Sequence, residues 1–203
     1  MLRYTEGMAR PRTHDEALRL RLLDRAGELL STEGAKALSL RKLAGDAGTS
    51  TTAVYSLFGS KPDLVNALYA EGFQRFGARM RAVPRTADPV EDFVRLGLAY
   101  RESALADPHL YSIMFTKAVP GFEPSAEATE LSQRTMAPLI ETVRQAIDAG
   151  RFTDTDPGTI AVSAWGIVHG LVSLELGGNL PPHLDVATSY EAALRAHARG
   201  WCR

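Results

Sequence analysis

The chain has 203 residues, 45% of them hydrophobic and 23% charged, which is the composition of a globular protein and excludes a disordered or collagen-like chain. Its single cysteine, Cys202, excludes an internal disulfide and is typical of a reducing cytosol. The net charge of −1 divides into +3 through Lys61 and −4 beyond it, so the N-terminal part has the sign that a polyanionic partner requires.

The first twelve residues, 1–12, are expected to form a flexible N-terminal arm. The arginines of this arm suit a minor-groove contact, and a solvated tail is the alternative interpretation. Thr13-His14-Asp15-Glu16 fits a capping box, and a stripe of leucines at helical spacing follows it. We therefore expect a first helix that ends near Gly34.

Two short helices separated by a glycine turn are predicted between Leu38 and Gly59. Ser39 and Ser50 stand where each helix would begin, and a serine side chain there accepts a hydrogen bond from a free backbone amide. Gly48 lies at the reversal, where glycine adopts a left-handed conformation without a side-chain clash. This layout is typical of a helix-turn-helix, whose second helix enters the major groove of DNA. An ordinary helical hairpin is the alternative, which the basic charge of this end disfavours.

Small polar residues lead the second helix, where short hydroxyls and a methyl group permit close approach to base edges. Tyr55 lies midway and can reach a phosphate, and Lys61 stands at the start of the next helix, where free backbone amides add to its charge. The residues predicted to bind DNA are Ser39, Arg41, Lys42, Ser50, Thr51, Thr52, Ala53, Tyr55, Ser56 and Lys61.

From about Asp15 to Leu68 the chain resembles the DNA-binding domain of the TetR family of bacterial transcriptional regulators. The family pattern ends in Tyr-x-x-Phe-x-x-Lys, which Tyr55, Phe58 and Lys61 match. Three positions depart from the pattern: Lys42, Thr49 and Leu57. The family often has an acidic residue, an apolar residue and a histidine there, so Leu57 is left out of the predicted contacts.

Residues 13–60 thus form the expected helix-turn-helix domain, residues 61–84 a connecting helix, and residues 85–203 a C-terminal ligand-binding and dimerisation domain. Asp-Pro pairs at 88 and 156 predict helix starts, because an N-cap followed by proline suits the first helical turn. The pair at 107 is expected to end the helix that starts at 88, and a short helical piece through Tyr111 and Phe115 follows it. A long helical pattern through Leu131 and Ile147 contains Pro138, which either kinks or divides it. The last helix is expected over about 185–200. No segment alternates at period two for long, so the fold class is all-α, with about nine helices.

The segment Ile160–Leu176 is nearly continuously apolar, but it is short for a membrane span and contains a histidine, two serines and Glu175. We expect a buried helix that also contributes to a subunit interface. The family resemblance implies a homodimer formed through the last two helices. Trp165-Gly166 and His169-Gly170 resemble an element of one branch of the family, and they favour either close helix packing or part of a pocket wall.

The resemblance implies a repressor that binds a near-palindromic double-stranded DNA operator and is released by a small-molecule effector. The candidates for effector binding are large or polar residues of the C-terminal helices, several of which serve equally well as core: Tyr100, Tyr111, Met114, Phe115, Met136, Trp165 and His169. The histidines lack metal-ligand spacing, and no nucleophile elbow, Walker or dinucleotide glycine pattern occurs. We therefore expect no enzyme activity, cofactor, metal site or membrane partner. The alternative function is a helical dimeric adaptor that binds protein without an operator.

Overall fold

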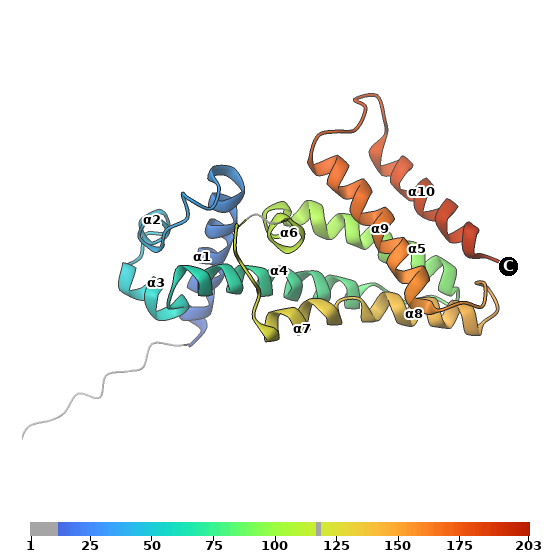
Figure 1. Cartoon of the computed structure of the whole chain (residues 1–203), viewed down its shortest axis with the longest axis horizontal. Coiled ribbons are helices and arrows are strands. Elements are labelled where there is room, and N and C mark those ends of the chain that lie inside the picture. The colour runs from blue at the N-terminus through green and yellow to red at the C-terminus, as the bar shows by residue number, and fades with distance from the viewer. Residues whose placement is uncertain (1–11, 117–118) are drawn as a thin grey trace, which may run out of the picture. The chain divides into compact units, whose positions relative to one another are not determined.

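The computed structural model describes residues 12–116 and 119–203, which fold into ten α-helices (Figure 1). Within them the only extended pairing is one antiparallel bridge between Phe152 and Cys202. The all-α prediction is confirmed. The ten helices compare with about nine expected, because the pattern around Pro138 is divided, at Thr135 and Met136, into two helices. The predicted arm lies outside the described residues except for Arg12, as do the side chains of Thr13 and His14 in the predicted capping box.

The chain forms two compact units, one through Leu68 with residues 119–122, the other from Tyr69 with the remaining residues. The N-terminal unit contains α1 (Arg12–Glu33), α2 (Leu40–Asp46), α3 (Thr51–Phe58) and the first turns of α4 (Lys61–Ala82). Its core consists of fully or nearly fully buried side chains from all four helices: Leu22, Leu23, Ala26, Leu29, Leu43, Val54, Phe58, Leu64 and Leu68.

Both short helices of this unit begin as the sequence predicts. The Ser39 hydroxyl accepts a hydrogen bond from the Lys42 amide, and the Ser50 hydroxyl accepts one from the Ala53 amide, each at 3.1 Å. Between them Gly48 has φ +62°, a conformation that side chains disfavour, and the chain reverses there. The caps and the glycine therefore set the angle at which α3 leaves α2.

The C-terminal unit consists of the rest of α4 and six further helices. Their bounds are α5 Pro89–Ala106, α6 Pro108–Phe115, α7 Ala126–Arg134, α8 Ala137–Asp148, α9 Pro157–Leu176 and α10 Val186–Trp201. Asp88 and Asp156 cap α5 and α9 as predicted. The core of this unit has Phe93, Val143, Phe152, Ile160, Val172 and Leu194 at its centre, all almost completely buried.

Helix α9 is long and apolar enough to cross a membrane by length and composition alone, which is weak evidence of a span. Only 28% of its most apolar window is buried within the single chain. Its one acidic residue, Glu175, forms a two-bond ion pair with Arg101 on α5, at 2.7 and 2.6 Å. One face of α9 packs on α5, α8 and α10, and the opposite face, with Val162 and Leu174, is exposed among the residues that the structure describes.

Candidate DNA-reading surface and ligand cavity

The recognition surface of the N-terminal unit is the outer face of α3. Val54 and Phe58, four residues apart, are buried and fix the inner face of this helix against the core. Thr52, Tyr55 and Ser56 lie on the opposite side and are exposed, with 55% of Tyr55 accessible. The outer face therefore consists of hydroxyl groups and one aromatic ring, with no acidic side chain to repel a phosphate.

The other predicted contact residues on α3 lie at the edges of this surface. Thr51 and Ala53 are half-buried, whereas Ser50 is exposed, although its oxygen already caps the helix. Ser39 has the same capping role on α2. Accepting this bond engages only the oxygen, so each serine hydroxyl keeps a proton that it can donate to DNA.

The two cations of α2 differ in their surroundings. Arg41 is exposed and has no ion-pair partner among the residues that the structure describes. The Lys42 ammonium lies 3.4 Å from a Glu33 oxygen and 3.7 Å from an Asp46 oxygen. Arg41 is thus the freer of the two to meet a phosphate, whereas Lys42 would have to leave its carboxylate partners.

Asp46 also accepts two hydrogen bonds from Arg25 of α1, at 3.0 and 2.8 Å. The Arg25 guanidinium lowers the pKa of the Asp46 carboxyl below its usual value, chiefly through these hydrogen bonds. The carboxylate therefore stays ionised at neutral pH and links α2 to α1.

Lys61 has an additional structural role that its position in the sequence does not reveal. Its ammonium donates a hydrogen bond of 2.5 Å to the backbone carbonyl oxygen of Ala35, in the turn between α1 and α2. The start of α4 is thereby held to that turn. An ammonium has three protons, so this bond leaves two available for a phosphate.

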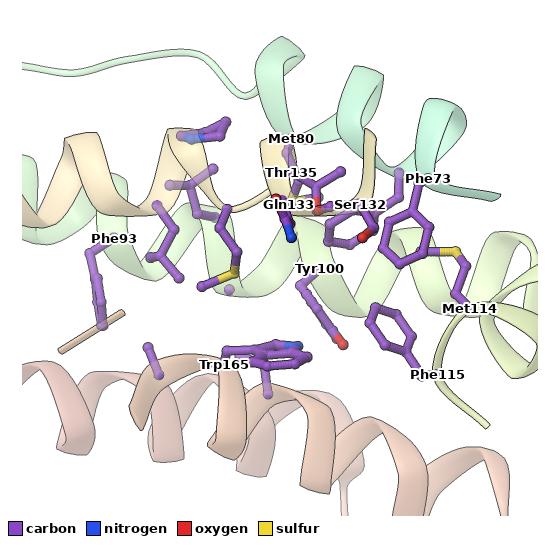
Figure 2. A pocket seen from close by; sticks show the side chains of 18 of the residues that line it. Phe73, Met80, Phe93, Tyr100, Met114, Phe115, Ser132, Gln133, Thr135 and Trp165 are labelled. Atoms are coloured by element: carbon purple, nitrogen blue, oxygen red, sulfur yellow. The ribbon is translucent and has the colours of Figure 1, made fainter. Parts of the chain in front are cut away.

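The C-terminal unit encloses a cavity of about 370 Å³, within the range of small-molecule sites (Figure 2). Aromatic and aliphatic side chains of α4, α5, α6, α8, α9 and α10 form most of its wall. Ser132, Gln133 and Thr135, at the end of α7, supply polar groups on one side, and the Trp165 ring lies on the other (Figure 2). Among the described residues, the lining contains no aspartate, glutamate, lysine, arginine or histidine.

Tyr100 lines the cavity and also contacts two polar side chains outside the lining, Tyr111 and His169. Its hydroxyl lies 3.2 Å from the Tyr111 hydroxyl and 3.2 Å from His169 Nδ1, and the Tyr111 hydroxyl lies 2.8 Å from the same nitrogen. Burial raises the pKa of both tyrosines and lowers that of His169, so all three groups are neutral near pH 7. The three groups form an uncharged hydrogen-bonded cluster.

Of the residues predicted to bind an effector, five line the cavity: Tyr100, Met114, Phe115, Met136 and Trp165. Tyr111 and His169 do not line it and belong to the hydrogen-bonded cluster instead. Sequence reasoning missed the α4 wall, formed by Tyr69, Phe73, Phe76 and Met80. These side chains follow the helical spacing of the predicted connecting helix, but nothing in their pattern distinguishes a cavity wall from a filled core.

A capped helix pair that presents a polar second helix, followed by a helical unit around an apolar cavity, defines a helix-turn-helix transcriptional regulator. Two protein-family models match the sequence. The family described as bacterial regulatory proteins, tetR family, matches residues 22–68, and the family described as tetracyclin repressor-like, C-terminal domain, matches residues 93–197. The chain belongs to the TetR family, whose members bind DNA and are generally not enzymes. No curated protein matches the chain significantly.

Solved structures with the same fold cover almost the whole chain. A protein with unknown function from Rhodococcus sp. RHA1 is 31% identical over 92% of this chain and 96% of its own, with a TM-score of 0.79. PfmR, a TetR family transcriptional regulator from Thermus thermophilus, is 20% identical over 90% of this chain and all of its own, with a TM-score of 0.71. NalD, the secondary repressor of the MexAB-OprM multidrug efflux pump in Pseudomonas aeruginosa, is 23% identical over 94% of this chain and 98% of its own, with a TM-score of 0.69. The last two likenesses show the shared fold alone.

Proposed function

We propose that the protein is a cytoplasmic transcriptional repressor that binds a near-palindromic operator as a homodimer and is released by a small-molecule effector. The observation that carries the DNA-binding part is the exposed polar face of α3, set opposite the two buried side chains that fix the helix. In a two-fold dimer two such helices read half-sites about 34–36 Å apart. Thr52 and Ser56 would face base edges, while Tyr55, Arg41 and Lys61 would hold phosphates.

The uncovered faces of α9 and α10 support a homodimer through the last two helices. On α9 the apolar side chains Val162 and Leu174 are 58% and 44% exposed. A Cβ added at Gly166 or Gly170 would meet no atom within 4 Å, so another backbone has room to approach there. Four such helices, two from each subunit, would bury this apolar surface, which is the main gain available to the dimer.

The cavity supports release by an effector. A ligand enclosed by α4, α5 and α9 would contact helices that lead to the DNA-reading unit and helices that form the proposed interface. It would thereby favour one dimer geometry over another. A coupling of about 1–3 kcal/mol between effector and operator, a five- to 150-fold change in affinity, is sufficient for regulation.

Fluorescence anisotropy with DNA from upstream of the gene, at two salt concentrations, tests the DNA-binding part. We expect Arg41→Ala to weaken binding about tenfold and to reduce the salt slope by about one. Arg144→Ala is the matched control, because Arg144 is an exposed arginine of α8 whose ion-pair partner in the described structure is Glu141. Unchanged operator affinity in the Tyr55→Ala, Lys61→Ala double variant would contradict the proposal. If the native protein gives no change in anisotropy, or a change that does not depend on salt, the protein-binding adaptor is favoured instead.

Sedimentation velocity tests the dimer. Leu174→Arg places a charge in the proposed interface and should produce a monomer that no longer binds the operator with dimer affinity. Leu105→Arg is the matched control, because Leu105 is similarly exposed, at 39%, but lies on α5. A Leu174→Arg protein that remains dimeric would place the interface elsewhere.

A further inference from the structure

The cavity of the C-terminal unit offers no group that could neutralise a charged ligand. Within the described part of the chain, its wall contains no ionisable side chain other than tyrosines. The buried carboxylates of this unit lie outside the wall and are already partnered, Glu71 with Arg75 at 2.8 Å and Asp92 with the Thr86 amide and hydroxyl, each at 2.8 Å. Burying an ion without a partner is strongly unfavourable, so this wall favours an uncharged ligand.

Two of the polar groups in the wall present a hydrogen-bond acceptor to a ligand, because in this structure each already donates its proton within the protein. The Ser132 hydroxyl donates its proton to the Thr129 carbonyl oxygen at 2.8 Å, and the Thr135 hydroxyl donates its proton to the Ser132 carbonyl oxygen at 2.6 Å. Each hydroxyl has one proton, which these bonds use, so each oxygen is left with a lone pair that can accept a hydrogen bond from a ligand. The Gln133 amide beside them can adapt to either kind of partner.

We infer, on the basis of the proposed effector function, that the cavity selects an uncharged, largely apolar ring compound that carries a hydroxyl or N–H donor. The aromatic side chains of Phe73, Phe115 and Trp165 (Figure 2), together with Phe76, match flat rings by edge and face contacts. The donor of the ligand bonds to the oxygens of Ser132 and Thr135, grouped on the α7 side of the cavity (Figure 2). Carboxylates are disfavoured because no lysine, arginine or histidine in the described lining neutralises them, and ammonium compounds are disfavoured because no aspartate or glutamate does.

Four naphthalene derivatives that differ only in the polar substituent test this inference at pH 7: 1-naphthol, 1-methoxynaphthalene, 1-naphthoate and 1-naphthylmethylammonium. Binding to the full-length protein without DNA is measured by isothermal titration calorimetry. We expect 1-naphthol to bind about three- to tenfold more tightly than its methyl ether, the contribution of one hydrogen bond. The two ions should bind at least about 100-fold more weakly than 1-naphthol.

Two variants assign the preference to the named oxygens. Thr135→Val keeps the shape of the side chain and removes its oxygen, and Ser132→Ala removes the other oxygen independently. In each, the ratio between 1-naphthol and its methyl ether should fall toward one, while binding of the ether stays unchanged. Thr129→Val is the matched control on the same helix, because Thr129 does not line the cavity, and it should keep the native ratio. Circular dichroism establishes that each variant is folded.

Several outcomes would overturn the inference. They are equal binding of the naphthol and its ether, tighter binding of either ion, and no binding of any probe. Tight binding of 1-naphthoate would instead implicate Arg81, an exposed arginine of α4 outside the lining. Because these measurements contain no DNA, failure of the ligand inference leaves operator binding intact. Loss of operator binding, in turn, leaves the ligand preferences measurable.

Discussion

A substitution at Phe152 tests how the helices of the C-terminal unit pack together. It follows α8, is completely buried, and meets Phe93 of α5 edge-on with ring centroids 5.5 Å apart. The neighbouring backbone pairs with the end of α10, where the Thr153 amide donates to the Trp201 carbonyl oxygen at 2.8 Å. Phe152 therefore ties three helices together from a position outside all of them.

Replacing Phe152 by alanine should lower the free energy of unfolding of this unit by about 3–5 kcal/mol, the usual cost of a buried Phe→Ala change. For a unit of this size that corresponds to a fall in Tm of about 10–20 °C. Phe152→Leu keeps most of the buried area and loses the edge-on ring pair, so its cost should be about 1–2 kcal/mol.

Urea unfolding followed by tryptophan fluorescence measures this effect in one unit, because both tryptophans of the chain, Trp165 and Trp201, belong to the C-terminal unit. Leu105→Ala is the control, since Leu105 is 39% exposed and should cost under about 1 kcal/mol. A Phe152→Ala protein no less stable than Leu105→Ala would refute the reasoning that this side chain holds the helices together.

Three further predictions concern pH, capping and the Lys61 bond. Burial lowers the pKa of His169 and His197 below the ordinary value of 6.5, so the unfolded chain takes up protons at a higher pH than the folded chain. The free energy of unfolding should therefore be at its full value above about pH 7 and decline toward pH 5. Equal urea midpoints at pH 7.5 and 5.5 would contradict this, as would an unchanged pH dependence of stability in the His169→Gln, His197→Gln double variant. Ser50→Ala removes the cap of α3 and should cost about 1 kcal/mol, seen as faster amide exchange in residues 51–58, whereas unchanged exchange would show the cap to be dispensable. Lys61→Met keeps the aliphatic stem but loses the bond to the Ala35 carbonyl, so the N-terminal unit should lose about 1 kcal/mol even without DNA, and a loss confined to operator affinity would reduce Lys61 to a phosphate contact.

Local signals in the sequence were sufficient for the helices and for the DNA-reading motif. Ser39, Ser50, Asp88 and Asp156 cap helices in the structure as predicted, because a cap is a contact between a residue and amides two or three positions away. The reversal at Gly48 is equally local. At Pro138 the local pattern permitted either a kink or a division, and the structure has two helices there, Ala126–Arg134 and Ala137–Asp148.

The tertiary structure alone decided what the side chains meet. Lys61 finds the carbonyl of Ala35, 26 positions away, and Tyr100 shares one nitrogen of His169 with Tyr111 across three helices. The apolar residues of α4 from Tyr69 to Met80 would have the same spacing in a filled core as in a cavity wall. Helical periodicity indicates which side of a helix is apolar, but it does not indicate how much space the facing helices leave unfilled. Secondary structure and the class of the protein thus follow from contacts within a few residues, whereas the cavity and its chemistry depend on distances that no short stretch of sequence contains.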